Sequence, residues 1–169
     1  KGHSSTRALQ LRDLKSLLSD TAPALIVRKG VIIVGFNPMP AVLTDRSVYV
    51  AVNEDQSDTV CDSLVAKLRE RKEDSLPFEL ITIEAVLEAT VESHLQIVRG
   101  ISRIVWDILQ GEHQRISQHA LHKILVSKKS IDETSGAVAL GSTALQHALE
   151  SEDVLRAMNL SLLRRRQGR

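Results

Sequence analysis

Aromatic residues and cysteine are scarce in this sequence. Phe, Tyr and Trp make up 2% of the 169 residues, and Trp106 is the single tryptophan. Proteins that bind single-stranded nucleic acid stack bases on aromatic side chains, so this chain offers no such platform. Cys61 has no second cysteine with which to form an internal disulfide or a CxxC motif. Nothing in the sequence therefore requires an oxidising compartment.

The chain also lacks an excess of charge and a long apolar run. Lys and Arg total 22 against 21 Asp and Glu, so no net field attracts nucleic acid or an anionic membrane over the whole surface. The apolar stretch at 24–36 is interrupted by Arg28 and Lys29, and it is shorter than the roughly 20 residues that span a bilayer. We therefore expect a water-soluble chain in which any electrostatic function is local.

Catalytic signatures are absent as well. The sequence contains no Walker loop, GxSxG elbow or GxGxxG turn. Glu79 and Glu84 stand beside apolar neighbours, which favours a packing corner over an open acid–base pair, since no partnered nucleophile is evident. His119 and His122 have helical spacing but no third ligand, so we interpret them as solvated side chains rather than zinc ligands. We predict that the chain is not an enzyme.

The first third of the chain predicts a small antiparallel sheet. Apolar runs at 25–27 and 31–34 flank a Lys-Gly pair, and Gly30 can take the positive φ of a tight turn. Residues 41–44 and 48–52 predict a second hairpin. The 43% apolar content supplies enough material for one compact core.

From Thr59 onward the apolar spacing changes to three and four residues, the period of an α-helix. The pattern predicts a surface helix packed on the sheet, followed by two long helices over 83–109 and 121–149. We expect the long helices to pair antiparallel through a turn around 111–115. Small residues between 135 and 144, including Gly136 and Gly141, make the second long helix slim enough for close approach to a neighbour.

A series of short segments follows a recognisable order along the chain. Residues 76–79 read LPFE and residues 84–87 read EAVL, which together are similar to the soluble signature lPFE...lE..L. Residues 11–14 resemble an opening arginine–aspartate motif, residues 24–34 and 41–52 two strand pairs, residues 125–131 the pattern LL..Kk.L, and residues 149–160 an acidic LddDeDMa.MyL segment. In this order the segments resemble the CorA-type magnesium channels, in their eukaryotic mitochondrial and plant branch.

The resemblance implies a fold, a location and a partner. It implies an α+β domain with a mainly antiparallel small sheet flanked by helices, and a long antiparallel helical hairpin that leads into a truncated stalk helix. We expect residues 1–7 to be an expression remnant or disordered, 8–163 to form a single regulatory domain, and 164–169 to be a basic tail at the start of the stalk. In the family this domain faces the mitochondrial matrix, and two membrane helices anchor a homopentamer in the inner membrane.

Conduction is not expected of this sequence. The membrane helices and the Gly-Met-Asn pore signature are missing, because Met39 and Met158 are the only methionines and neither lies between Gly and Asn. For this part of the protein the resemblance implies a regulatory role. In the family, Mg²⁺ bound to the soluble domain disfavours the conducting state. We therefore expect Mg²⁺ to act as a weak regulatory ligand.

Four acidic residues are the candidate magnesium ligands. Glu150, Glu152 and Asp153 form a cluster, and Mg²⁺ typically uses one or two carboxylates while keeping several waters. Glu133 stands where the family pattern has an acid, but its i+4 position is Ala137, so a carboxylate pair on one helix face is missing. An alternative stays open for the cluster, because acids at the start of a helix near Ser151 also stabilise that helix through its dipole.

Two alternative functions remain open at this stage. The arginines at 164–166 and 169 could contact phosphates, as in a nucleic-acid-binding module. The near-zero net charge and scarce aromatics argue against that interpretation, and we expect no nucleic-acid partner. The second alternative is a structural domain that self-associates through its long helices without any response to metal.

Overall fold

The computed structural model describes residues 23–28, 30–51, 57–71, 76–110 and 117–167, with side chains undescribed at 57–60 and 164–167. The expectations for residues 1–7, for the motif at 11–14 and for the turn at 111–115 concern residues outside these ranges. The described part is an α+β fold with a small antiparallel sheet and long helices, as the sequence predicts.

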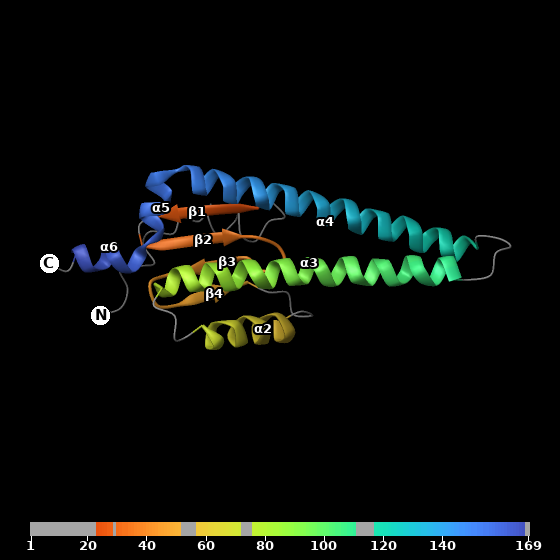
Figure 1. Cartoon of the computed structure of the whole chain (residues 1–169), viewed down its shortest axis with the longest axis horizontal. Coiled ribbons are helices and arrows are strands. Elements are labelled where there is room, and N and C mark those ends of the chain that lie inside the picture. The colour runs from red at the N-terminus through yellow and green to blue at the C-terminus, as the bar shows by residue number, and fades with distance from the viewer. Residues whose placement is uncertain (1–22, 29, 52–56, 72–75, 111–116, 168–169) are drawn as a thin grey trace.

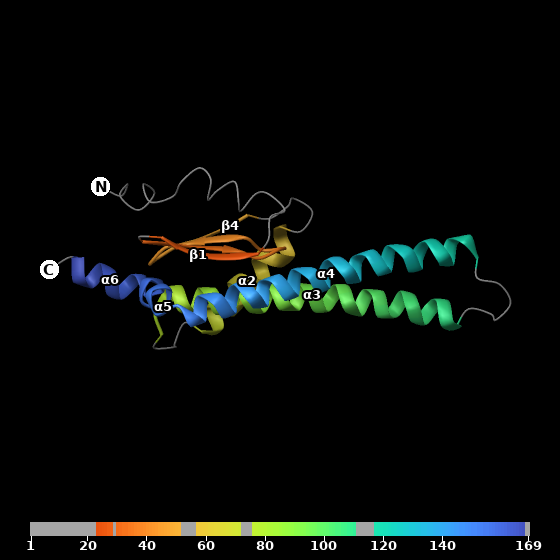
Figure 2. The same ribbon diagram turned by 90° about the horizontal axis from the view of Figure 1, so that it is seen from above.

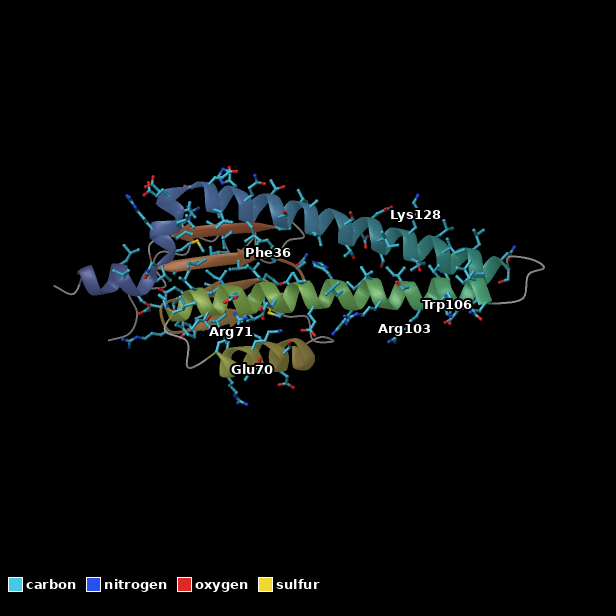
Figure 3. All side chains as sticks on the ribbon, in the orientation of Figure 1. Phe36, Glu70, Arg71, Arg103, Trp106 and Lys128 are labelled. Atoms are coloured by element: carbon cyan, nitrogen blue, oxygen red, sulfur yellow. The ribbon has the colours of Figure 1, made fainter. Side chains whose placement is uncertain are left out.

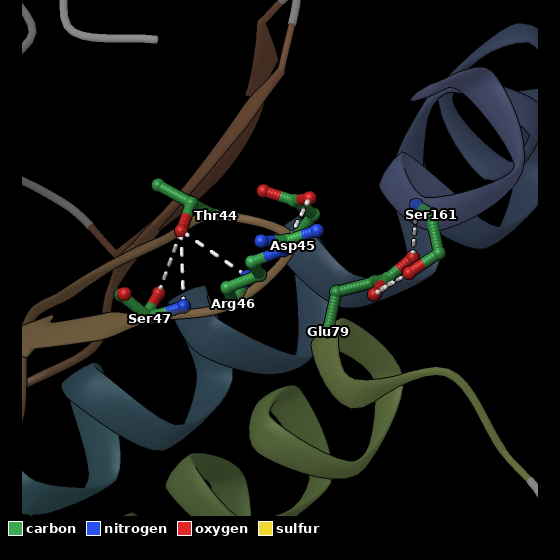
Figure 4. A network of polar contacts seen from close by, with 6 residues as sticks. All are labelled: Thr44, Asp45, Arg46, Ser47, Glu79 and Ser161. Carbon is green, nitrogen blue, oxygen red and sulfur yellow. Dashed lines mark hydrogen bonds and ion pairs between the residues drawn. The ribbon is translucent and has the colours of Figure 1, made fainter. Parts of the chain in front are cut away.

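The sheet is a four-stranded antiparallel meander in the order β1-β2-β3-β4. The strands are β1 (Ala24–Arg28), β2 (Val31–Gly35), β3 (Ala41–Leu43) and β4 (Val48–Val50). Both predicted hairpins are present, and Gly30 has a φ of 81°, the left-handed conformation that a glycine adopts without steric cost. At the β3–β4 turn, the Thr44 hydroxyl accepts the Ser47 N–H at 3.0 Å (Figure 4).

Both faces of the central strand β2 are buried. Ile32 and Val34 point to one face and belong to the main core, whereas Val31 and Ile33 point to the other and form a second, smaller cluster. Alternation of side chains along a strand explains this division. A strand buried on both faces has a continuous apolar run, which is what residues 31–34 show.

In the described ranges, five helices follow the sheet: α2 (Ser57–Glu70), α3 (Phe78–Gln110), α4 (Gln118–Glu150), α5 (Glu152–Met158) and α6 (Leu160–Gln167). The two 33-residue helices α3 and α4 run antiparallel as a hairpin. The sheet forms one layer and the base of this hairpin forms the other, while the far half of the hairpin extends beyond the sheet (Figures 1 and 2). Helix α2 lies alongside α3 (Figure 1).

The main core joins the sheet to the first turns of α3. Val86 is fully buried and Ile83 nearly so, and both share one apolar cluster with Ile32, Val34 and the other buried core residues. Each fully buried aliphatic side chain contributes on the order of 1.5–3 kcal/mol relative to its exposed state. This contact therefore anchors α3, and with it the hairpin, to the sheet.

A ladder of ion pairs ties α2 to the side of α3. Lys67 lies 3.6 Å from Glu88 and 3.5 Å from Glu92, and Arg71 pairs with both Glu88 and Glu84. The three glutamates are spaced by four residues, so they form one stripe along α3. Because Lys67 of α2 and Arg71, the residue after α2, pair with all three acids of this stripe, the stripe helps to hold the two helices together.

Helix α4 approaches the sheet through its small residues. A Cβ built on Gly141 would lie 3.3 Å from the Phe36 ring, whereas one on Gly136 would meet nothing within 4 Å. The predicted close approach of the slim segment is therefore present at Gly141. The side chain that Gly141 approaches is Phe36, the residue after β2.

The two glycines give a matched test of this packing. Gly141→Val should lower the free energy of unfolding by about 1–3 kcal/mol, because the added methyl groups overpack against Phe36. Gly136→Val makes the same change of helix propensity in open space, so it should be neutral or slightly stabilising. Urea denaturation of both variants measures the difference, and equal free energies of unfolding would contradict the contact.

Candidate metal site at the corner between α4 and α5

The chain turns sharply between α4 and α5 at Ser151. Ser151 has φ −98° and ψ 105°, ends α4 and begins α5, and its hydroxyl accepts the Val154 N–H at 3.4 Å. Glu150 is the last residue of α4, and Glu152 and Asp153 are in the first turn of α5. The corner therefore gathers three of the four predicted ligands within four residues, and it confirms the predicted helix start near Ser151.

The three carboxylates of this acidic corner, Glu150, Glu152 and Asp153, are exposed. Glu150 accepts a hydrogen bond from the Gln146 amide at 3.0 Å, and Glu152 pairs with Arg156 one turn later at 2.6 Å. Within the described ranges, the Asp153 carboxylate makes no hydrogen bond or ion pair. Exposed ion pairs are worth about 0–1 kcal/mol, so a cation could compete for these oxygens.

Glu133 lies elsewhere. It is separated from Glu150 by about 25 Å of α4, at 1.5 Å of rise per residue, and its carboxylate lies 3.7 Å from Lys129. The structure therefore does not bring Glu133 to the acidic corner within one chain. Among the residues with described positions, no three His, Cys, Asp or Glu side chains are arranged to hold a metal ion.

Glu79 is a polar residue whose part in the structure the sequence did not predict. Its side chain is fully buried in the first turn of α3. One carboxylate oxygen accepts the Ser161 N–H at 2.7 Å and the other accepts the Ser161 hydroxyl at 2.8 Å (Figure 4). The sequence shows a carboxylate two residues after Pro77, at the start of a helix, but nothing in it indicates that Ser161 is the partner of this carboxylate.

Beyond the sheet, the hairpin exposes much apolar surface. On α3, Val91 follows the buried Ala89 by two residues, which is about 200° around the helix, so it points away from the core. On α4 the buried positions are small, at Ser127, Gly141 and Ala148, and the apolar residues lie about a quarter turn from them. The apolar repeat that predicts α4 is therefore largely exposed, and small residues face the rest of the fold.

We call the exposed apolar stripes of the two long helices the outer face. Its members are 37–68% exposed: Val91, Leu95, Val98, Val105 and Leu109 of α3, and Ile124, Ile131, Val138 and Leu149 of α4. Arg103, Trp106 and Lys128 lie in the half of the hairpin that extends beyond the sheet (Figure 3). Large apolar side chains that are exposed in such number mark a candidate interaction surface.

The histidines do not form a site in the described structure. His119, His122 and His147 are exposed. His94 on α3 is half-buried, and burial lowers its pKa below the usual 6.5. Its Nδ1 atom is buried and has no hydrogen-bond partner within the described ranges. His94 is therefore held neutral.

The burial of His94 predicts a dependence of stability on pH. Well above pH 6.5 the residue is neutral in both folded and unfolded chains, and its full contribution to stability is present. As the pH falls from 6.5 through the lowered pKa, the unfolded chain takes up a proton more readily, so the free energy of unfolding decreases. His94→Gln should flatten this part of the profile, as measured by urea denaturation between pH 7.5 and 5.5, and His147→Gln is the exposed control. An unchanged slope in His94→Gln would contradict the prediction.

Comparison with known proteins finds a family whose members resemble almost the whole chain. The sequence profile of the family described as "Magnesium transporter MRS2-like" matches residues 4–169. The mitochondrial inner membrane magnesium transporter mrs2 of Aspergillus fumigatus is 25% identical over 158 residues, which cover 89% of this chain and 26% of that protein. The mrs2 protein of Schizosaccharomyces pombe is 23% identical over 158 residues, with coverage of 89% and 37%.

The chain thus spans about a quarter to a third of the length of these relatives. Among the helices that the structure describes, none combines the length and the apolar character needed to cross a membrane.

Proposed function

Because this chain belongs to the MRS2-like family of magnesium transporters, we propose that it is the regulatory domain through which a longer transporter senses Mg²⁺. Both relatives carry names that place them in the mitochondrial inner membrane. The proposed location of this domain is the matrix side of that membrane. Conduction would belong to parts of the protein outside these 169 residues.

The acidic corner is the observation that carries the proposal. Mg²⁺ keeps several of its waters and binds through one or two carboxylates, so Asp153 and Glu152 would suffice without a closed protein cage. The C-terminus of α4 adds partial negative charge beside them, although the N-terminus of α5 adds partial positive charge. These opposing effects and the exposure of the site favour weak binding, which suits a sensor of free Mg²⁺ concentration.

Nothing among the comparisons supports a nucleic-acid-binding function. The structural alternative for the acidic corner keeps a physical basis, because Glu152 and Asp153 lie where a helix dipole stabilises negative charge by about 0.3–1 kcal/mol. A direct binding measurement separates this alternative from the sensing role, since a purely structural corner gives no saturable response to Mg²⁺.

Calorimetric titration with Mg²⁺ at constant ionic strength tests the proposal. The parent chain should bind Mg²⁺ saturably, with a dissociation constant in the millimolar range, and Na⁺ should give no comparable heat. The double variant Glu152→Ala with Asp153→Ala should lose this binding without unfolding, since both side chains are exposed.

Glu133→Gln is the matched control for this titration. Because Glu133 lies about 25 Å along α4 from the corner, its loss should leave the binding unchanged. A double variant that binds Mg²⁺ as the parent does would exclude the acidic corner. The absence of saturable binding by the parent would exclude the sensing role for this chain.

We further propose that the domain self-associates, as a homopentamer in the longer protein. The observation that favours self-association is the outer face, which repeats at heptad spacing on α4 through Ile124, Ile131 and Val138, with the charged Lys128 between the first two. Such spacing is typical of a surface that contacts another helix.

Two residues of α4 test this use of the outer face. Val138 and Leu140 are similarly exposed, at 51% and 50%, but they lie about 200° apart around the helix. Val138→Gln should raise the dissociation constant for self-association by about tenfold, because it places a polar group in an apolar contact. Leu140→Gln should leave it unchanged. Sedimentation equilibrium measures both, and a parent chain that stays monomeric at high concentration would contradict the proposal.

A further inference from the structure

The last helix leaves the body of the domain through a short joint. Helix α5 ends at Met158, and Asn159 has φ −82° and ψ 76°, outside the helical region. The Asn159 side-chain oxygen accepts the Leu162 N–H at 3.1 Å, which caps the start of α6. Helix α6 therefore begins in a new direction, and Figure 1 shows it extending from the end of the domain opposite the tip of the hairpin.

Of the four α6 side chains that the structure describes, at residues 160–163, Leu160 alone is buried. Met158 and Leu160 are 9% and 3% exposed and belong to the main core. Two residues later, Leu162 is already 48% exposed. The apolar contact at Leu160 fixes where the helix starts, but apolar burial is non-directional. It therefore does not determine the direction in which α6 points.

The directional contact is the one with Glu79. Both oxygens of its fully buried carboxylate are engaged by Ser161, one by the backbone N–H and one by the hydroxyl. Hydrogen bonds to a charged group are worth about 1.5–3 kcal/mol each, and the N-terminus of α6 adds partial positive charge. A carboxylate buried away from water requires such compensation, so the geometry of this pair has little freedom.

We infer that Glu79 acts as a clamp that sets the direction in which the chain leaves the domain through α6. Glu79 is a positioning residue in this role: it fixes the first turn of α6 against the first turn of α3, which the sheet in turn anchors. Helix α6 can take another direction only when both hydrogen bonds to Ser161 break. The clamp stands independently of the proposed magnesium site, although α5 alone, about 10 Å long, separates it from the acidic corner.

Distance measurements between two spin labels test the clamp without any metal. The labels are placed at Leu162→Cys on α6 and Gln96→Cys on α3, both exposed positions, in a chain where Cys61 is replaced by Ser. The parent should give one narrow distance distribution. Glu79→Ala and Ser161→Ala should each broaden or shift it, whereas Glu70→Ala, at an exposed position of α2, should not.

Hydrogen exchange supplies a second readout. The amide of residue 161 should exchange about tenfold faster or more in Glu79→Ala, because it loses its charged acceptor, while amides of the α3–α4 hairpin keep the parent rate. Glu79→Gln keeps one acceptor oxygen and should restore most of the protection. A merely structural role for Glu79 would instead raise exchange throughout the domain.

The outcome does not depend on the folding of one variant. If Glu79→Ala fails to fold, Ser161→Ala decides, because it removes only a hydroxyl at a half-buried position. A label distance in Ser161→Ala as narrow as in the parent, together with unchanged exchange at residue 161 in that variant, would overturn the inference. Ser102→Ala is the exposed control. A distance distribution that broadens in Ser161→Ala but not in Ser102→Ala would support the inference.

Discussion

The packing of one sheet face against the first three turns of α3 is the contact on which the rest of the structure depends. Ile32, Val34 and Leu43 of the sheet share a core with Ile83 and Val86 of α3. The buried Glu79 and the ion pairs of Arg71 with Glu84 and Glu88 attach to the same turns of α3. Helices α2 and α6 therefore take their positions from this short stretch of α3, whereas α4 and α5 also pack on the sheet at β1.

This constraint explains the division of the molecule into a well-packed base and an exposed hairpin. Beyond residue 90 the sheet no longer covers α3, and Ile101 is the one apolar residue of the far half of α3 that is buried. On α4 small residues and Leu145 pack toward the core, so the other large apolar residues of its repeat remain exposed. At the other end of the molecule, the corner at Ser151 and the clamp at Ser161 lie at the two ends of α5. The proposed sensing site and the exit of the chain are thus neighbours in the fold.

The sequence predicted the elements well and their contacts less well. Alternation and glycine placement predict the two hairpins, and the spacing of three and four predicts both long helices, because these signals are local. The sequence did not indicate which side of α4 faces the core. The repeat of large apolar residues is a clearer pattern than the row of small residues, and it is the small residues that are buried. Glu79 and Ser161 are 82 residues apart, so no periodic pattern in the sequence indicates that they pair. The acidic corner was predicted because its members are adjacent, whereas Glu133 was grouped with them on family resemblance and lies far along α4.

The measurement that tests the account most directly is an amide chemical-shift titration of the ¹⁵N-labelled chain with Mg²⁺ at constant ionic strength. The account predicts saturable shifts at residues 150–154, which surround the acidic corner, with smaller changes along α5 toward Ser161 and none around Glu133. Shifts that grow linearly without saturation, or that saturate only at Lys129 and Glu133, would contradict it.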